Sequence, residues 1–169
     1  MDITTPRLLL IPATCELIEA VLDDQRASEV VLQNVTVPAS WPGTQEALDG
    51  LRIHLAELRA DPAQLAWRIR LIVLRDTRLA IGSVNLKGPP RNETVEIGWG
   101  LVASARGHGY TREAAAAVVG WLTLQPEVSR IIATIDDANA PSIRIAEHLG
   151  MTRTEERRRG LPVHAIAVP

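Results

Sequence analysis

The segment Arg106-Gly107-His108-Gly109-Tyr110-Thr111 combines residue types that suit the binding of a phosphorylated ligand. An alanine-rich stretch follows it and predicts a helix that begins near Tyr110. Backbone N–H groups at a helix start have no partner within the helix, and the helix dipole adds positive potential there. Gly107 and Gly109 lack a Cβ, so a diphosphate can approach the main chain closely, and Arg106 adds a fixed positive charge. The segment therefore indicates an anion-binding loop.

The loop differs from two common phosphate-binding motifs. No Gly-Lys-Ser/Thr triplet follows it, as in nucleotide hydrolases, and the third glycine of the dinucleotide-binding fingerprint is absent. A plain turn between a strand and a helix would also explain the two glycines. The spacing by itself leaves both interpretations open.

A strand predicted over Thr94–Val102 leads into this loop, and its two faces differ in character. Apolar residues fall on one face, and Glu96 shares the other face with two glycines, Gly98 and Gly100. The apolar positions are Val95, Ile97, Trp99 and Leu101. Two glycines on one face often mark close approach by a ligand or another backbone, whereas a bulge or a tight fit against a helix is the alternative.

The loop resembles the coenzyme A signature of the GNAT superfamily, (Gln/Arg)-x-x-Gly-x-(Gly/Ala). Arg106, Gly109 and Thr111 stand at its three defined positions, and Thr111 departs from the usual Gly or Ala. A second segment, Asn139–Met151, resembles the family block Asn-x-x-Ser-x-x-Val-Ala-Glu-x-Leu-Gly-Phe, with Met151 in place of Phe. The chain is therefore identified as a member of the GNAT acetyltransferases.

Two shorter segments, Thr5–Leu8 and Glu96–Trp99, resemble the RimJ/RimL-like subgroup, which acetylates the N-termini of ribosomal proteins. The resemblance implies acetyl-CoA as co-substrate, with its pyrophosphate on the loop amides and its pantetheine arm between two splayed strands. The coenzyme-binding positions that it implies are Trp99, Leu101, Arg106, Gly107, His108, Gly109, Tyr110, Thr111 and Asn139.

The resemblance also suggests catalytic residues for direct attack of an amine on the thioester. Glu96 is the candidate general base, acting directly or through a water, and a solvated surface carboxylate is the alternative. Many relatives protonate the thiolate with a tyrosine seven residues after the motif asparagine, but here that position is Ala146. Ser142 matches the hydroxyl of the RimJ/RimL-like subgroup and is the candidate acid. A serine that satisfies local backbone at a helix start is the alternative.

The elements that must position these residues alternate along the chain. Strands are predicted at Arg7–Ile11, Trp67–Leu74, Leu79–Leu86, Thr94–Val102, Arg130–Asp136, Thr152–Arg157 and Val163–Val168. Helices are predicted at Ala13–Leu22, Thr44–Arg59, Tyr110–Leu124 and Pro141–Leu149. The order predicts an α/β (α+β) fold. We expect one GNAT-type domain over residues 1–169, with a mixed, mostly antiparallel sheet, flanking helices and splayed central strands.

Composition excludes several other functions. The 169 residues carry a formal net charge of −2, so the chain lacks the excess positive charge that is typical of nucleic-acid-binding proteins. No apolar run approaches the ~20 residues that a bilayer demands, and the N-terminus does not resemble a signal peptide. Cys15 is the only cysteine, and the four histidines show no metal-ligand spacing, so we expect no metal. These features favour a cytoplasmic protein.

Three functions follow from these observations. The first is acetylation of a protein or peptide N-terminus, and the second is acetylation of a small-molecule amine. The third is a non-catalytic module that binds coenzyme A. The expected partner is thus an amine acceptor, with no nucleic acid and no membrane, and a homodimer is left open.

Overall fold

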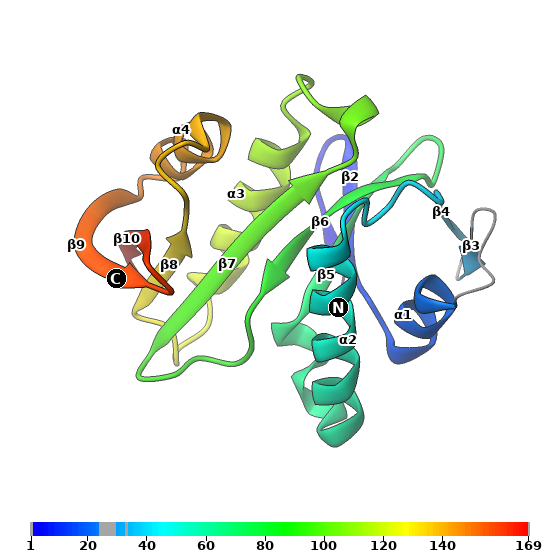
Figure 1. Cartoon of the computed structure of the whole chain (residues 1–169), viewed down its shortest axis with the longest axis horizontal. Helices are drawn as coiled ribbons and strands as arrows, with labels where there is room; N and C mark the ends of the chain where they lie inside the picture. Colours follow the sequence, from blue (N-terminus) through cyan, green and yellow to red (C-terminus); the bar gives the residue numbers. More distant parts are fainter. Residues whose placement is uncertain (1, 24–29, 33, 169) are drawn as a thin grey trace.

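The computed structural model describes residues 2–23, 30–32 and 34–168, and its centre is an eight-stranded sheet (Figure 1). The strand order is β1-β2-β5-β6-β7-β8-β10-β9, and every neighbouring pair is antiparallel except β7 and β8. The strands are β1 (Ile3–Thr4), β2 (Leu8–Pro12), β5 (Ile69–Leu74), β6 (Ala80–Leu86), β7 (Thr94–Leu101), β8 (Arg130–Thr134), β9 (Thr152–Arg158) and β10 (Leu161–Ala167).

Helices cover both faces of this sheet, with α2 in front of it and α3 behind β7 in Figure 1. The helices are α1 (Cys15–Leu22), α2 (Gln45–Ala60), α3 (Tyr110–Leu122) and α4 (Ala140–His148), with 3-10 turns at Pro62–Trp67 and Ala103–Ala105. A separate two-stranded ribbon joins β3 (Val30–Leu32) to β4 (Val35–Val37).

The core has two main parts because each sheet face carries its own apolar residues. Leu17 of α1 and Leu51 of α2 pack with Leu71 of β5 on one face. Val118 of α3 packs with Ile97 of β7 on the other. The predicted alternation along β7 is therefore correct, and burial of its apolar side fixes which residues face the opposite side.

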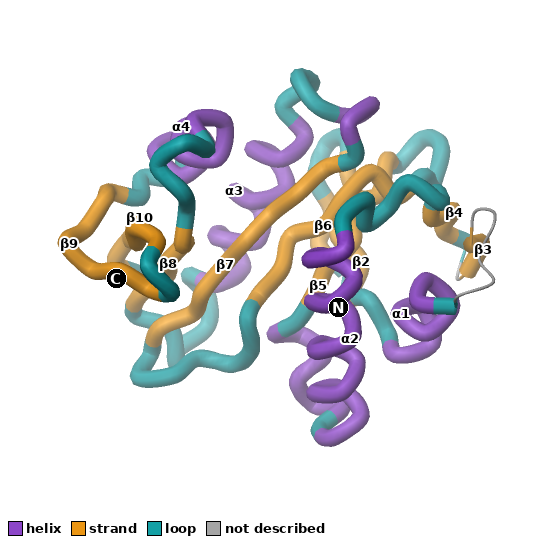
Figure 2. Tube along the Cα trace, in the orientation of Figure 1, coloured by secondary structure: helices purple, strands orange, loops and turns teal. Residues whose placement is uncertain are grey.

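The central strands splay as predicted. β7 and β8 pair in parallel only at Thr94↔Arg130, Val95↔Ile131 and Glu96↔Ile132. β7 then continues to Leu101 alongside β6 alone. Beyond Glu96 the two strands part, and Figure 2 shows β7 running on toward the loop before α3.

The predicted elements all occur, with shifted ends. The strand expected from Trp67 begins at Ile69, because Pro62–Trp67 form a 3-10 turn. The helix expected to reach Leu124 ends at Leu122. β1, β3 and β4 were not predicted, because two or three residues are too few to show a period of two.

Candidate active site

A cleft of about 780 Å³ opens where β7 leaves β8, beside the starts of α3 and α4. Its lining residues come from five separate parts of the chain. They are Trp41, Pro42, Thr44, Ala47, Ser83, Asn85, Trp99, Gly100, Leu101, Arg106, Gly107, Gly109, Tyr110, Thr111, Arg112, Asn139, Pro141, Ser142, Arg144 and Ile145. All predicted site residues except Glu96 and His108 are among them.

The loop before α3 has the backbone shape expected of an anion site. Gly107 and Gly109 adopt left-handed φ angles of 82° and 77°, and Gly109 is the N-cap of α3. The first helical bond runs from the Glu113 N–H to the Gly109 carbonyl at 3.1 Å. The N–H groups of the preceding helical residues are therefore available to a ligand, where the helix dipole favours negative charge.

Three arginines reinforce this positive end of the cleft. Arg106 begins the loop, Arg112 lies in the first turn of α3 and Arg144 lies on α4. The Arg106 guanidinium also lies 3.4 Å from the Leu101 carbonyl through both Nε and Nη2, which ties it to the end of β7. The group as a whole suits a ligand that carries several phosphate charges.

The glycine face of β7 is open. A Cβ built on Gly98 or Gly100 would meet no atom within 4 Å, so a tight fit against a helix does not explain these glycines. The register with β6 is regular here, so a bulge does not explain them either. Gly82 is different, because its Cβ would lie 2.1 Å from the Gly100 carbonyl oxygen.

Two polar residues of β6 share this face and were not predicted. Ser83 pairs with Gly100, and Asn85 pairs with Gly98. The Asn85 Oδ1 is buried and has no hydrogen-bond partner within residues 2–23, 30–32 and 34–168. Nothing in the local pattern of β6 identified them, because their proximity to β7 depends on strand register.

Glu96 lies at the point where β7 and β8 part, on the same face as the glycines. Its side chain is 10% exposed. The Thr134 hydroxyl donates to its Oε1 at 3.3 Å, and the Arg158 Nη1 lies 3.6 Å from its Oε2. The carboxylate is thus held by contacts with β8 and β9, and it is not part of the cleft lining.

Ser142 lies in the first turn of α4, facing the cleft. Asn139 caps this helix, since its Oδ1 accepts the Ser142 N–H at 3.2 Å. In the described part of the chain the Ser142 hydroxyl has no hydrogen-bond partner, so it is not the group that satisfies the helix start. Ala146, at the position of the tyrosine of other relatives, is fully buried.

His108 does not line the cleft. Its Nδ1 lies 2.8 Å from the Arg106 carbonyl oxygen, and its ring stacks on Tyr110 with the centroids 5.6 Å apart.

Trp99 and Leu101 line the cleft and also pack against the core beneath α3. The strand main chain at these two positions is therefore held firmly from one side.

A second cavity of about 380 Å³ lies between the end of α1 and the start of α2. Trp41, Pro42 and Thr44 line both cavities, so the two adjoin. Trp41 is only 4% exposed and packs in the core, and it also lines the cleft.

Comparison with known proteins identifies the family. Residues 7–152 match the acetyltransferase (GNAT) domain, so the chain belongs to the GNAT acetyltransferase family. It is 34% identical over 82 residues to the uncharacterized N-acetyltransferase YnaD of Bacillus subtilis, across 48% of each chain. It is 31% identical over 113 residues to the uncharacterized N-acetyltransferase YjdG of the same organism, across 65% of this chain and 66% of YjdG. The matches thus span about half to two thirds of these relatives.

Solved structures show the same fold. An acetyltransferase from Agrobacterium tumefaciens superposes with a TM-score of 0.69 at 21% identity, over 98% of this chain and 94% of that one. RimL, a ribosomal L7/L12 α-N-protein acetyltransferase in complex with coenzyme A, superposes with a TM-score of 0.65 at 16% identity, over 99% and 98% of the two chains.

The described residues also bear on two other kinds of site. They contain no group of three or more His, Cys, Asp and Glu side chains arranged to hold a metal ion. No helix among them combines the length and the hydropathy that crossing a bilayer requires.

Proposed function

We propose that this protein transfers an acetyl group from acetyl-CoA to a primary amine by direct attack. The cleft is the observation that carries the proposal. One end of the cleft has a helix start with available amides and three arginines. Beside this end lies an open strand face that carries glycines. The first end suits the diphosphate, and the gap beside β7 suits the narrow pantetheine arm. The thioester would then lie between β7 and the start of α4.

The chemistry needs a proton acceptor, an oriented thioester and a proton donor. The amine nitrogen attacks the carbonyl carbon, the C–N bond forms, and the C–S bond breaks. Glu96 lies two residues before Gly98 on the same face, about 7 Å along the strand. We assign Glu96 as the general base. It would remove the amine proton through a water molecule, because Glu96 is not in the cleft lining. Ser142 would protonate the departing thiolate.

The acceptor that the geometry favours is a protein or peptide N-terminus, as in the RimJ/RimL-like subgroup. A peptide has a chain that must leave the site after its first residue. The second cavity adjoins the cleft through Trp41, Pro42 and Thr44, and it offers space for that chain. A small amine would not need the space of the second cavity. RimL, which shares the fold, is itself an α-N-protein acetyltransferase.

The test is a measurement of free thiol released from acetyl-CoA over a panel of acceptors. The panel pairs each peptide with its N-terminally blocked twin and adds small amines, including amino acids and polyamines. We expect release with free peptides and none with blocked ones. Cys15 can add at most one thiol per chain, so the signal must exceed one equivalent.

Each other outcome assigns a different function. Release with small amines alone would replace the proposed acceptor by a small molecule. Calorimetric binding of acetyl-CoA without release for any amine would make the chain a coenzyme A-binding module. The absence of binding would remove the proposal altogether.

A further inference from the structure

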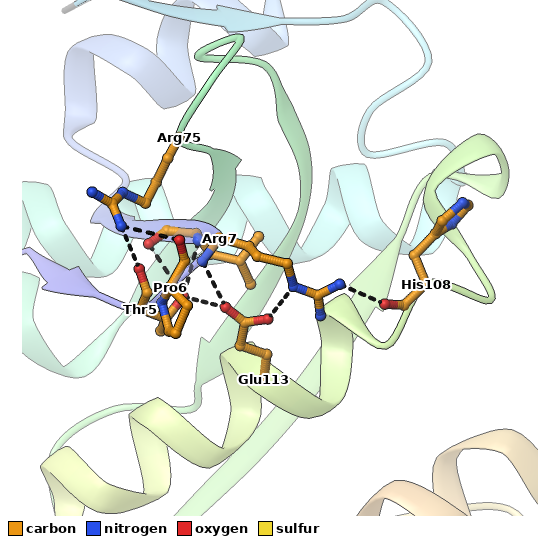
Figure 3. A network of polar contacts seen from close by, with 7 residues as sticks. Thr5, Pro6, Arg7, Arg75, His108 and Glu113 are labelled. Carbon is orange, nitrogen blue, oxygen red and sulfur yellow. Dashed lines mark hydrogen bonds and ion pairs between the residues drawn. The ribbon is translucent and has the colours of Figure 1, made fainter.

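A network of polar contacts ties the N-terminal segment to the loop before α3 and to the first turn of α3 (Figure 3). The Arg7 Nε donates to the Glu113 Oε2 at 2.6 Å, and the Arg7 backbone N–H donates to the Glu113 Oε1 at 3.0 Å. The Thr5 hydroxyl donates to the same Oε1 at 2.6 Å. Glu113 lies in the first turn of α3, so these bonds attach the segment directly to the helix start.

Arg7 also reaches the loop itself. Its Nη1 donates to the His108 carbonyl at 3.0 Å, as Figure 3 shows. Its guanidinium lies 4.6 Å from the centroid of the Tyr110 ring, within the range of a cation–π contact. The Arg75 Nη1 in turn donates to the carbonyls of Thr5 and Pro6 at 3.1 and 3.0 Å, which fixes the segment that carries Arg7.

These contacts have a consequence for the loop amides. In a planar trans peptide the C=O and the N–H point in opposite directions. Arg7, which does not line the cleft, binds the His108 carbonyl, so the Gly109 N–H points away from Arg7, and Gly109 itself lines the cleft. The His108 ring holds the Arg106 carbonyl in the same manner, with the proton on Nδ1, and this turns the Gly107 N–H away from the His108 ring.

We propose that Arg7 and His108 are positioning residues that hold the loop in its diphosphate-binding shape from outside the cleft. They touch no reacting atom, since neither lines the cleft. They fix two amides, each next to a glycine, before the ligand arrives. The entropic cost of ordering the loop therefore falls on folding and not on binding. The inference rests on the proposed use of acetyl-CoA.

The electrostatics of the network agree with this role. Burial by itself would raise the pKa of Glu113. Hydrogen bonds from the Thr5 hydroxyl and from Arg7, together with the charge of Arg7, outweigh that effect and lower its pKa. The carboxylate therefore stays ionised and keeps hold of the Arg7 guanidinium across the neutral pH range.

The test compares acetyl-CoA affinity and kinetics in Arg7→Ala, Arg7→Lys and His108→Ala. We expect Arg7→Ala to weaken binding and raise KM about tenfold with kcat retained, as when one hydrogen bond to a charged group is weakened. His108→Ala changes an exposed side chain and should act in the same direction. Lys keeps the charge, but its ammonium cannot reach both Glu113 and the His108 carbonyl, so it should restore affinity only in part.

Two controls separate positioning from other effects. Arg59→Ala removes an exposed arginine that pairs with Glu19 at 2.7 Å on the α1–α2 side, and it should leave KM unchanged. S-acetyl-pantetheine lacks the diphosphate, so its turnover should be the same in wild type and Arg7→Ala.

Each contrary outcome overturns the inference in a distinct way. Full affinity in Arg7→Lys would show that only charge matters. Unchanged affinity in both alanine variants, even with a lower melting temperature, would leave the network a purely structural brace. Failure of the wild-type protein to bind acetyl-CoA would instead defeat the proposed function.

Discussion

At the scale of single residues, Ser142 provides the clearest test of mechanism. Asn139 already caps α4, so Ser142→Ala should leave the melting temperature nearly unchanged. If the hydroxyl protonates the thiolate, turnover should fall about 10²-fold, the lower end for acid–base groups. The loss is modest because a thiolate whose conjugate thiol has a pKa of about 8.5 is a good leaving group without assistance.

Ser142→Thr keeps a hydroxyl and should retain most of the turnover. Asn139→Ala removes the cap and should lower the free energy of unfolding by about 1 kcal/mol, which calibrates the thermal measurement. Normal turnover in Ser142→Ala would mean that Ser142 lines the cleft but has no role in proton transfer.

Glu96 can be tested by a pair of substitutions, because its carboxylate has a structural partner. Glu96→Gln should lower turnover while coenzyme affinity stays nearly intact, since a base acts on the amine. The loss should shrink as pH rises and more amine arrives neutral. Arg158→Gln breaks the same 3.6 Å ion pair but keeps the carboxylate.

Rates measured across a pH series therefore distinguish a general base from a structural ion-pair partner at Glu96. Equal losses in Glu96→Gln and Arg158→Gln would mean that the ion pair, and not proton transfer, matters. A loss that does not change with pH would argue the same way.

At the scale of elements, the junction between the loop and α3 depends on Gly109. Its φ of 77° is a left-handed conformation, which Asn and Asp tolerate better than most residues. Gly109→Asp should weaken acetyl-CoA binding strongly because it places a negative charge beside the diphosphate. Gly109→Asn has nearly the same shape without the charge and should bind much more tightly than the Asp variant.

Calorimetry on the two Gly109 variants isolates the charge from the bulk. Equal affinity in wild type and Gly109→Asp would place the diphosphate elsewhere and remove the central claim about the loop. Equal but weak binding in both variants would assign the effect to bulk alone.

At the scale of the whole molecule, His54 makes stability depend on pH. It lies on α2, is 6% exposed, and burial, then Lys87, then Arg68 lower its pKa from 6.5 to about 4. Below pH 6.5 the unfolded chain binds a proton that the folded chain does not. Stability is therefore lost as pH falls from about 6.5 to 4, by about 3 kcal/mol at most.

Urea unfolding of wild type and His54→Gln at pH 7.5 and pH 4.5 measures this contribution. Carboxylates such as Glu113 also titrate, so the quantity of interest is the difference between the two proteins. The variant should lose less stability than the wild type on acidification. An identical loss in both would contradict a neutral, buried His54.

The sequence by itself determined the features that adjacent residues carry. The glycines of Arg106–Thr111, the alternation along β7 and the Asn139–Met151 block are local patterns. They predicted the fold, the family and nine of the twenty residues that line the cleft. Their physics needs only neighbours in the chain: free amides at a helix start, a period of two, and a capped helix.

Only the tertiary structure decided what meets these features from elsewhere. Arg7 reaches a loop about a hundred residues away, Asn85 faces the glycines through strand register, and Glu96 meets Arg158 where two strands part. Thr5–Leu8 was visible as a family segment, but nothing in it indicated a contact with His108. Such contacts depend on how strands pair and helices dock across the whole domain, and a local pattern of residue types leaves that pairing undetermined.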